Sequence, residues 1–323
     1  MDYRKIIKEI GRGKNHARDL DQETAQALYA GMLRGDVPDL ELGGVLIALR
    51  VKGEGESEMQ GFYQATRAHT MQLSAPANRP LPIVIPSYNG ARKLPNLTPL
   101  LALLLSRLGF PVVVHGVSDD PGRVITETLF SMMGIEAVHS RGQAQAELEG
   151  DKPVYIPVSA LCPPLATQLA LRWRMGVRNS AHTLAKLLTP FPEGAALRLS
   201  SVSHPEYLSR VSQFFQTIGG QALVMHGTEG EVYANPLRCP QINWVNAQGE
   251  QVVYARQAEV IPAPVFPSGK DPQLTVEWLT RCLRGEEPVP ESIQVQLACC
   301  LLAATEVATL EEGLQRVRQS IQG

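Results

Sequence analysis

The stretch Leu81–Gly116, LPIVIPSYNGARKLPNLTPLLALLLSRLGFPVVVHG, decides the fold. It opens on an apolar, β-branched run and passes through a loop that carries Gly90, Arg92 and Lys93. The apolar segment LTPLLALLLSRLG and a second β-branched run, VVVHG, then follow. Two such runs around a segment of helical length are typical of a strand, helix and strand in a parallel sheet. The loop after the first strand should therefore lie where open α/β sheets bind ligands, beyond the carboxyl ends of the strands.

The same alternation continues along the chain, through VITETLFSMMG, AALRLSSVS, EYLSRVSQFFQTIG and QALVMHG. Residues 2–68 instead carry apolar residues at three- and four-residue spacing, and MQLSAPANRP is typical of a linker. We predict an α/β protein with a small N-terminal helical domain, residues 1–72. A larger α/β domain, residues 73–323, should hold a mostly parallel central sheet. The helix near residues 165–190 is expected to pack on the helical domain.

The composition is that of a globular protein, with 44% hydrophobic residues in 323 and a formal net charge of -2. A charge this close to zero excludes a protein that is basic all over, so nucleic acid would need a local patch. The five cysteines are scattered without zinc-site spacing, and we interpret them as reduced core thiols. The start carries no apolar leader, and the most apolar segments are too short for a bilayer or are broken by Arg107 and Glu306. We therefore expect a cytoplasmic protein without membrane contact.

Several stretches resemble the anthranilate phosphoribosyltransferase family. They are DLDQETAQALYAGMLRGDVPDLELGGVLIALRVKGEGESEMQGF, VVVHG, RWRMGVRN, LLTPFP, ALVMHGTEG and the terminal ATLEEGLQRVRQSIQG, so the likeness covers nearly the whole chain. The family shares the fold of nucleoside phosphorylases and of glycosyltransferase family 3. Within it, the chain is most similar to a TrpD-like paralogue group that is associated with nucleic-acid binding rather than tryptophan synthesis. The resemblance implies a homodimer formed through the helical domain, but a fold alone does not settle function.

The loop after the first strand departs from the family pattern. The enzymes resemble one another in a Gly-Thr-Gly-Gly-Asp loop whose backbone N–H groups approach pyrophosphate. Those positions fall here on Pro86, Ser87, Tyr88, Asn89 and Gly90. Proline has no N–H, tyrosine adds bulk, and a glycine stands in place of the aspartate. The substitutions predict that the pyrophosphate site is lost.

Two further phosphate contacts implied by the resemblance are incomplete. Asn96 and Thr98 retain half of an Asn-x-Ser-Thr contact. A Lys-His-Gly-Asn-Arg stretch falls on residues 114–118, where only His115 and Gly116 remain and both cations are gone. We interpret these residues as parts of a degenerate ancestral cleft.

The magnesium ligands implied by the resemblance are also missing. The Asp-Glu pair falls on Val232 and Tyr233, and neither offers the carboxylate oxygen that a hard cation prefers. Glu229 and Glu231 lie close by but at other positions of the loop. We therefore expect no catalytic residues, no metal, and neither magnesium nor phosphoribosyl pyrophosphate as a cofactor or substrate.

A cationic segment points to a different ligand. Between Leu161 and Phe191 the chain has no Asp or Glu, although it carries several cations at four-residue spacing. On one helix that spacing would form a stripe, which favours a polyanion surface. In the resemblance Arg178 matches the arginine that holds the anthranilate carboxylate, so the stripe should border the same cleft as the loop cations. The predicted nucleic-acid contacts are Arg92, Lys93, Arg172, Arg174, Arg178 and Lys186, with His182 in the same stripe.

A second basic cluster lies near the start, at Arg12, Lys14 and Arg18, and is either a phosphate-binding surface or ordinary solvated charge. Aromatic residues add to the argument because they stack on unpaired bases. Tyr88 is the predicted stacking residue. Trp173 is a second candidate, although its position next to an apolar face favours a place in the core.

Together these features predict a homodimeric, non-enzymatic protein that binds DNA or RNA without strong sequence preference, and preferably as single strands. The rival hypothesis is a phosphoribosyltransferase, or a related phosphorolysis on another base, that uses Asn96, Thr98, His115 and Arg178. A third is a small-ligand sensor that kept the fold and lost the chemistry.

Overall fold

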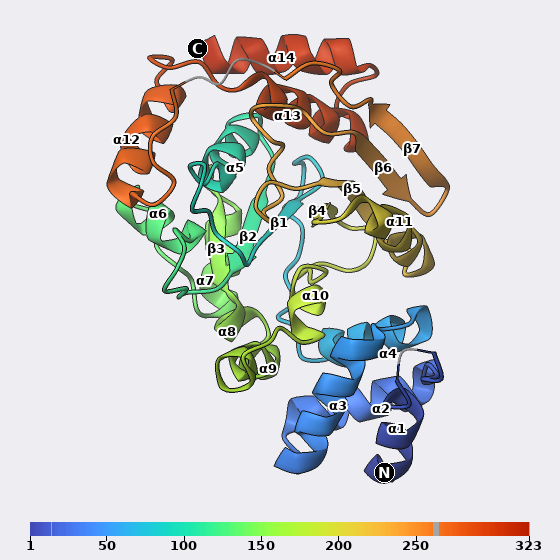
Figure 1. The fold of residues 1–323 in the computed structure, drawn as a ribbon. Helices are drawn as coiled ribbons and strands as arrows, with labels where there is room; N and C mark the ends of the chain where they lie inside the picture. The colour runs from blue at the N-terminus through green and yellow to red at the C-terminus, as the bar shows by residue number, and fades with distance from the viewer. Residues whose placement is uncertain (14, 261–264, 323) are drawn as a thin grey trace. The chain divides into compact units, whose positions relative to one another are not determined.

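The computed structural model describes residues 1–13, 15–260 and 265–322, which form two compact units. One unit comprises residues 1–71 together with 158–188, and the other comprises residues 72–157 together with 189–323 (Figure 1). The first unit is helical, and the second contains the sheet. Lys14 lies outside the described residues.

The helical unit is built around the pair α2 and α4. Asp21 begins α2 by accepting a hydrogen bond from the Thr24 N–H at 2.8 Å, and Gly35 ends it in the left-handed region at φ 78°. Tyr29 and Phe62 stack between α2 and α4 with ring centroids 4.8 Å apart. The helices of this unit are α1 (Tyr3–Ile10), α2 (Gln22–Arg34), α3 (Asp39–Lys52), α4 (Glu56–Arg67), α8 (Val158–Leu161), α9 (Pro163–Met175) and α10 (Ala181–Ala185).

A buried ion pair lies in this unit. The Lys52 ammonium lies 2.6 Å from Glu58, whose carboxylate also accepts the backbone N–H groups of Leu20 at 3.0 Å and Gly55 at 2.7 Å. Because Glu58 is fully buried, these donors are what makes its burial tolerable. The pair thus fixes the end of α3 against the start of α4.

The second unit contains a seven-stranded sheet in the order β3-β2-β1-β4-β5-β6-β7. The first five strands are parallel, and β6 and β7 add an antiparallel edge. The predicted fold class, a helical domain followed by a mostly parallel sheet, is confirmed. The strands are β1 (Ile83–Ser87), β2 (Val112–Gly116), β3 (Val154–Pro157), β4 (Leu197–Val202), β5 (Gln221–His226), β6 (Ile242–Asn246) and β7 (Gly249–Tyr254).

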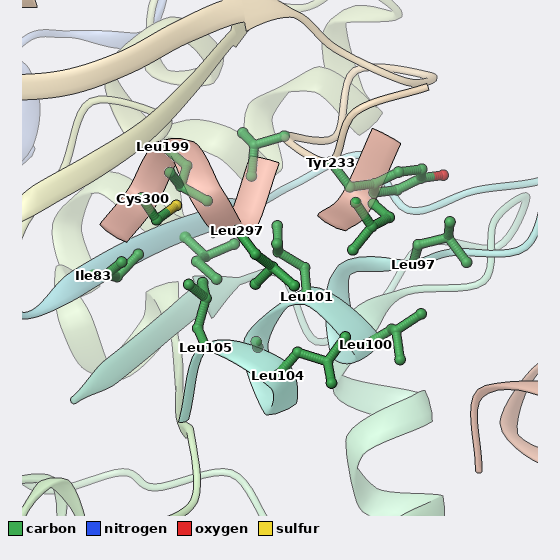
Figure 2. Close-up of a cluster of buried hydrophobic side chains, with 14 of the residues drawn as sticks. Ile83, Leu97, Leu100, Leu101, Leu104, Leu105, Leu199, Tyr233, Leu297 and Cys300 are labelled. Atoms are coloured by element: carbon green, nitrogen blue, oxygen red, sulfur yellow. The ribbon is translucent and has the colours of Figure 1, made fainter. Parts of the chain in front are cut away.

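One face of this sheet is covered by leucine-rich helices. Leucines of α5 and α13 meet Ile83 of β1 and Leu199 of β4 in a single apolar cluster (Figure 2). Such burial of apolar surface is the main source of stability for a sheet of this kind. The remaining helices of the unit are α5 (Thr98–Arg107), α6 (Thr126–Met132), α7 (Arg141–Leu148), the 3-10 turn η1 (Pro205–Tyr207), α11 (Leu208–Thr217), α12 (Pro272–Leu283), α13 (Glu291–Ala303) and α14 (Leu310–Gln322).

The five cysteines are all free and buried, which confirms their interpretation as core thiols. Burial raises the pKa of Cys239 and of Cys282 to about 12, so both stay protonated at neutral pH. In the described part of the chain, no helix has the length and apolar composition that a membrane span requires.

Candidate functional site

The loop after β1 is folded into the protein interior. Residues 86–90 are all buried, and Tyr88 is only 7% exposed. The Tyr88 hydroxyl lies 2.7 Å from His115 Nδ1 on the neighbouring strand β2. The expectation that Tyr88 stacks on bases is therefore not supported, because its ring is already enclosed by protein.

A buried carboxylate lies inside this loop. Glu231 Oε1 accepts the backbone N–H groups of Asn89 and Gly90, each at 2.8 Å. Its second oxygen, Oε2, accepts the Ser87 hydroxyl at 2.6 Å and the Thr98 hydroxyl at 3.2 Å. Glu231 is fully buried, so four neutral donors stabilise its negative charge.

A second carboxylate holds the next part of the loop. Glu229 Oε1 accepts the backbone N–H groups of Lys93 at 2.9 Å and Leu94 at 3.0 Å, and Oε2 accepts that of Arg92 at 3.3 Å. The Arg123 guanidinium lies 3.6 Å from the same carboxylate. Together the two glutamates satisfy five backbone N–H groups of the loop.

Both glutamates come from one tight turn after β5. Thr228 and Glu231 exchange backbone hydrogen bonds of 2.9 and 3.1 Å, and the two residues between them have positive φ, 51° at Glu229 and 89° at Gly230. This is the geometry of a type I′ turn. A Cβ at Gly230 would collide with the side-chain amide of Asn89, so glycine lets the turn approach the loop this closely.

The other residues of the ancestral cleft also bond to the protein itself. Asn96, Thr98 and His115 are fully buried. Asn96 donates to Thr126 Oγ1 at 3.0 Å and accepts the Thr98 N–H at 3.1 Å, which begins α5. A Cβ at Gly116 would collide with the Ser87 carbonyl oxygen, so this glycine permits the close approach of β1 and β2.

The residues present do not fit a magnesium ion. Val232 and Tyr233 are buried without a carboxylate, and the Tyr233 hydroxyl donates to the Pro95 carbonyl at 3.2 Å. The carboxylates of Glu229 and Glu231 are occupied by backbone and hydroxyl donors, whereas a metal ligand needs free oxygen lone pairs.

The predicted cationic helix is two helices rather than one, so the expectation of a continuous stripe is wrong. Helix α9 ends at Met175, Gly176 adopts φ 73°, and α10 begins only at Ala181. The Gly176 N–H donates to the Arg172 carbonyl at 2.8 Å, a common way for a helix to end. Four-residue spacing therefore does not by itself align Arg174 with the later cations.

Several cations of this segment nevertheless act on the charge of His182. Burial, and after it the positive charge of Arg178, lowers the pKa of His182 from 6.5 to about 4, and Arg172 and Lys186 act in the same direction. His182 is consequently neutral at pH 7 and does not contribute to the positive charge. Arg172, Arg178 and Lys186 thus all disfavour a positive charge on this half-buried ring.

Trp173 is exposed rather than part of the core, so that expectation is wrong. Its side chain is 58% exposed, and the Arg172 guanidinium carbon lies 4.2 Å from the centre of its ring. Arg174 is exposed as well and lies 3.7 Å from Asp39 of α3. A pair this exposed contributes little binding energy, so Asp39 leaves Arg174 available to other anions.

The other predicted contact residues have mixed environments. Arg92, Lys93, Arg12 and Arg18 are exposed, and Arg12 pairs with Glu9 at 2.7 Å. Arg92 and Lys93 belong to the second unit, whereas the other predicted cations belong to the first. That both groups border one cleft stays a prediction.

Comparison with known proteins identifies the relatives. Residues 4–70 match the model of the helical bundle domain of a glycosyl transferase family. The Escherichia coli (strain K12) protein YbiB is 67% identical over 320 residues, which cover 99% of this chain and 100% of that one. The chain belongs to the YbiB family.

More distant relatives of this YbiB-family chain are enzymes. The anthranilate phosphoribosyltransferase of Desulfitobacterium hafniense (strain Y51) is 24% identical over 94% of this chain and 91% of its own. The crystal structure of the Thermus thermophilus enzyme matches with a TM-score of 0.79 at 23% identity, over 99% of this chain and 94% of that chain. The Saccharomyces cerevisiae enzyme in complex with PRPP and Mg matches with a TM-score of 0.76 at 14% identity, over 99% and 93%. These likenesses confirm the fold.

Sequence reasoning about this YbiB-family chain named Glu229 and Glu231 only as residues near the lost magnesium ligands and did not predict their contacts with the loop after β1. A signal was present, because strands β1 and β5 of a parallel sheet end at the same edge and the TEGE segment follows β5 directly. Acidic residues that follow one strand are therefore candidates to satisfy the N–H groups that follow another.

Proposed function

We propose that this protein binds nucleic acid through its backbone phosphates, without sequence specificity and with a preference for single strands. The observation that carries the proposal is the end of α9, where Trp173 and Arg174 are exposed and the half-buried Arg172 lies over the Trp173 ring. Guanidinium groups neutralise phosphate, and an exposed indole ring stacks on an unpaired base. Trp173 takes the stacking role that the sequence had assigned to Tyr88.

The absence of enzyme activity is part of the proposal. The donors of the ancestral cleft are engaged by Glu231 and Glu229, and its polar side chains bond to one another. Phosphoribosyl transfer needs those donors and a metal to stabilise pyrophosphate. We therefore propose that neither magnesium nor phosphoribosyl pyrophosphate is a ligand, and that the protein acts in the cytoplasm on nucleic acid.

We also propose a homodimer that forms through the helical unit. Helix α3 exposes an apolar stripe in which Leu40 is 84%, Ile47 44% and Val51 65% exposed. Gly43 lies on the same stripe, and nothing lies within 4 Å of where its Cβ would be. Because Arg174 lies near Asp39 at the start of α3, a dimer on this stripe would hold two basic surfaces on one assembly. A strand that reaches both would gain affinity through effective concentration.

The test is fluorescence anisotropy with labelled single-stranded oligonucleotides over a salt series. We expect affinity that falls steeply with salt, and at least a ten-fold loss in the triple variant R172E/R174E/R178E. The matched control is R141E/K152E/R256E, which changes the net charge equally at exposed cations of the second unit. Equal losses in both variants, or binding that is insensitive to salt, would remove the basis of the proposal.

Phosphoribosyl transfer is the second candidate, and the relatives at 24% identity over almost the whole chain favour it. Calorimetry with magnesium and phosphoribosyl pyrophosphate discriminates, because saturable binding would require the loop to open. The third candidate, a small-ligand sensor, would be revealed by thermal stabilisation with a metabolite but not with an oligonucleotide.

A further inference from the structure

The donors around Glu231 form an oxyanion site in their own right. Two consecutive backbone N–H groups, of Asn89 and Gly90, point at one oxygen, and the hydroxyls of Ser87 and Thr98 point at the other. Successive N–H groups with flanking hydroxyls make the concave donor set that holds phosphate and carboxylate in proteins. The Glu231 carboxylate supplies two oxygen atoms to that set.

The Glu231 carboxylate is stabilised by neutral hydrogen-bond donors, as a bound anion often is, and not by a cation as in a salt bridge. Within the described residues, its hydrogen-bond partners are neutral and no cation forms an ion pair with it. The donors come from residues more than 130 positions away in the sequence, in the loop after β1 and at the start of α5. The loop therefore depends on an anion that arrives from elsewhere in the fold.

The donor set has supports that do not involve Glu231. Ala91 and Val124 exchange backbone hydrogen bonds of 2.9 and 3.1 Å, and Glu229 holds the N–H groups of Lys93 and Leu94. Removal of the Glu231 side chain would thus leave the donors near their present positions, around an empty space of carboxylate size.

We propose that Glu231 is a built-in anionic ligand of a latent oxyanion site. The site binds inorganic phosphate or a small carboxylate once the Glu231 side chain is removed, and the intact side chain excludes such anions. The proposal rests on the loop of the second unit and does not depend on nucleic-acid binding. If this proposal fails, the proposed nucleic-acid binding at the end of α9 is not affected, because E231A retains Arg172, Trp173 and Arg174.

The experiment is chemical rescue of full-length E231A. Thermal unfolding is followed at pH 7.5 in rising concentrations of sodium phosphate or sodium acetate, with sodium chloride at equal ionic strength as reference. We expect E231A to melt below the wild type and to be stabilised saturably by phosphate and acetate beyond the effect of chloride. The wild type should respond alike to all three salts.

The matched control is E231M, in which the methionine side chain fills the space without accepting a hydrogen bond. It should lose stability and gain nothing specific from phosphate or acetate. If E231A does not fold in chloride, the yield of folded protein after dilution from urea is compared across the three salts. A higher yield in phosphate or acetate supports the proposal, whereas an identical response of E231A to all three salts, in melting or in refolding, overturns it.

Discussion

Two regions of this protein present groups that attract anions. In one region these groups are already bonded to carboxylates of the chain, whereas in the other the groups are exposed to solvent. In the loop of residues 87–94 the donors are backbone N–H groups, which are buried at Asn89 and Gly90, and carboxylates of the same chain engage them. Around α9 and α10 the positive groups are side chains, and Arg174 and the neighbouring Trp173 are exposed. A buried donor left without an acceptor destabilises the fold, whereas an exposed cation remains hydrated. Substitutions in the first region should therefore alter stability, and substitutions in the second should alter binding.

The largest expected effect is at Glu231. In E231Q the amide keeps the size of the side chain but directs an NH₂ group at donors, so we expect a loss of about 3 kcal/mol in the free energy of unfolding. E229Q is the matched variant and should lose only about 1 kcal/mol, because Arg92 and Lys93 are exposed and water can replace the acceptor. Urea denaturation of both variants measures the difference. Equal losses of stability in E231Q and E229Q would show that water does not replace the acceptor at Arg92 and Lys93 more easily than at the buried Asn89 and Gly90.

Gly230 tests the turn that carries the two glutamates. G230A forces alanine into a positive φ and pushes its Cβ into the Asn89 amide, so we expect a loss of about 2 to 3 kcal/mol. The control is G142A in α7, where a new Cβ meets nothing within 4 Å. That variant should be neutral or slightly more stable. A tolerant response at Gly230, measured in the same denaturation series, would mean that the loop accepts another turn geometry.

The fold was predictable because its signals are local. The runs IVI and VVV are buried on both sides in β1 and β2, and continuous β-branched runs are what a buried parallel strand requires. The break after Met175 was also predictable in principle, since Gly176 interrupts the cationic segment at a position suited to a left-handed helix end. The expected stripe assumed that one helix continues through Gly176, and the backbone does not form such a helix.

The candidate site was harder to predict, because its contacts join distant segments. Glu231 meets Asn89 across 142 positions, and no periodicity records such a pairing. Tyr88 is buried in a place where its hydroxyl lies 2.7 Å from His115 of β2, and Trp173 is exposed near the end of α9. Residue types therefore indicated which segments matter, while only the tertiary arrangement determined which side chains face the solvent.

His182 gives the cationic segment a measurable effect on stability. Its pKa falls from 6.5 to about 4 on folding, so between these values the unfolded state binds a proton that the folded state does not. Stability should consequently fall as the pH drops from about 6.5 to about 4, by about 2 kcal/mol after allowance for partial exposure. H182L, which cannot titrate, should lose less over the same interval. The measurement is urea denaturation of both proteins at several pH values. If the free energy of unfolding falls by the same amount in the wild type and in H182L, the His182 ring is not desolvated.

The smallest expected effect is at Trp173, where it should appear in binding alone. Because the indole is exposed, W173A should change the free energy of unfolding by less than about 0.5 kcal/mol. If the ring stacks on a base, W173A should weaken single-strand binding by about 1 kcal/mol, roughly five-fold, while W173F retains most of the affinity. Duplex DNA of equal length should be less affected, since its bases are already stacked. An equal loss of affinity for single strands and duplex would mean that Trp173 does not stack on a base. The ring would then only support Arg172, whose guanidinium lies over it, and the positive charge of the segment would be the sole determinant of binding.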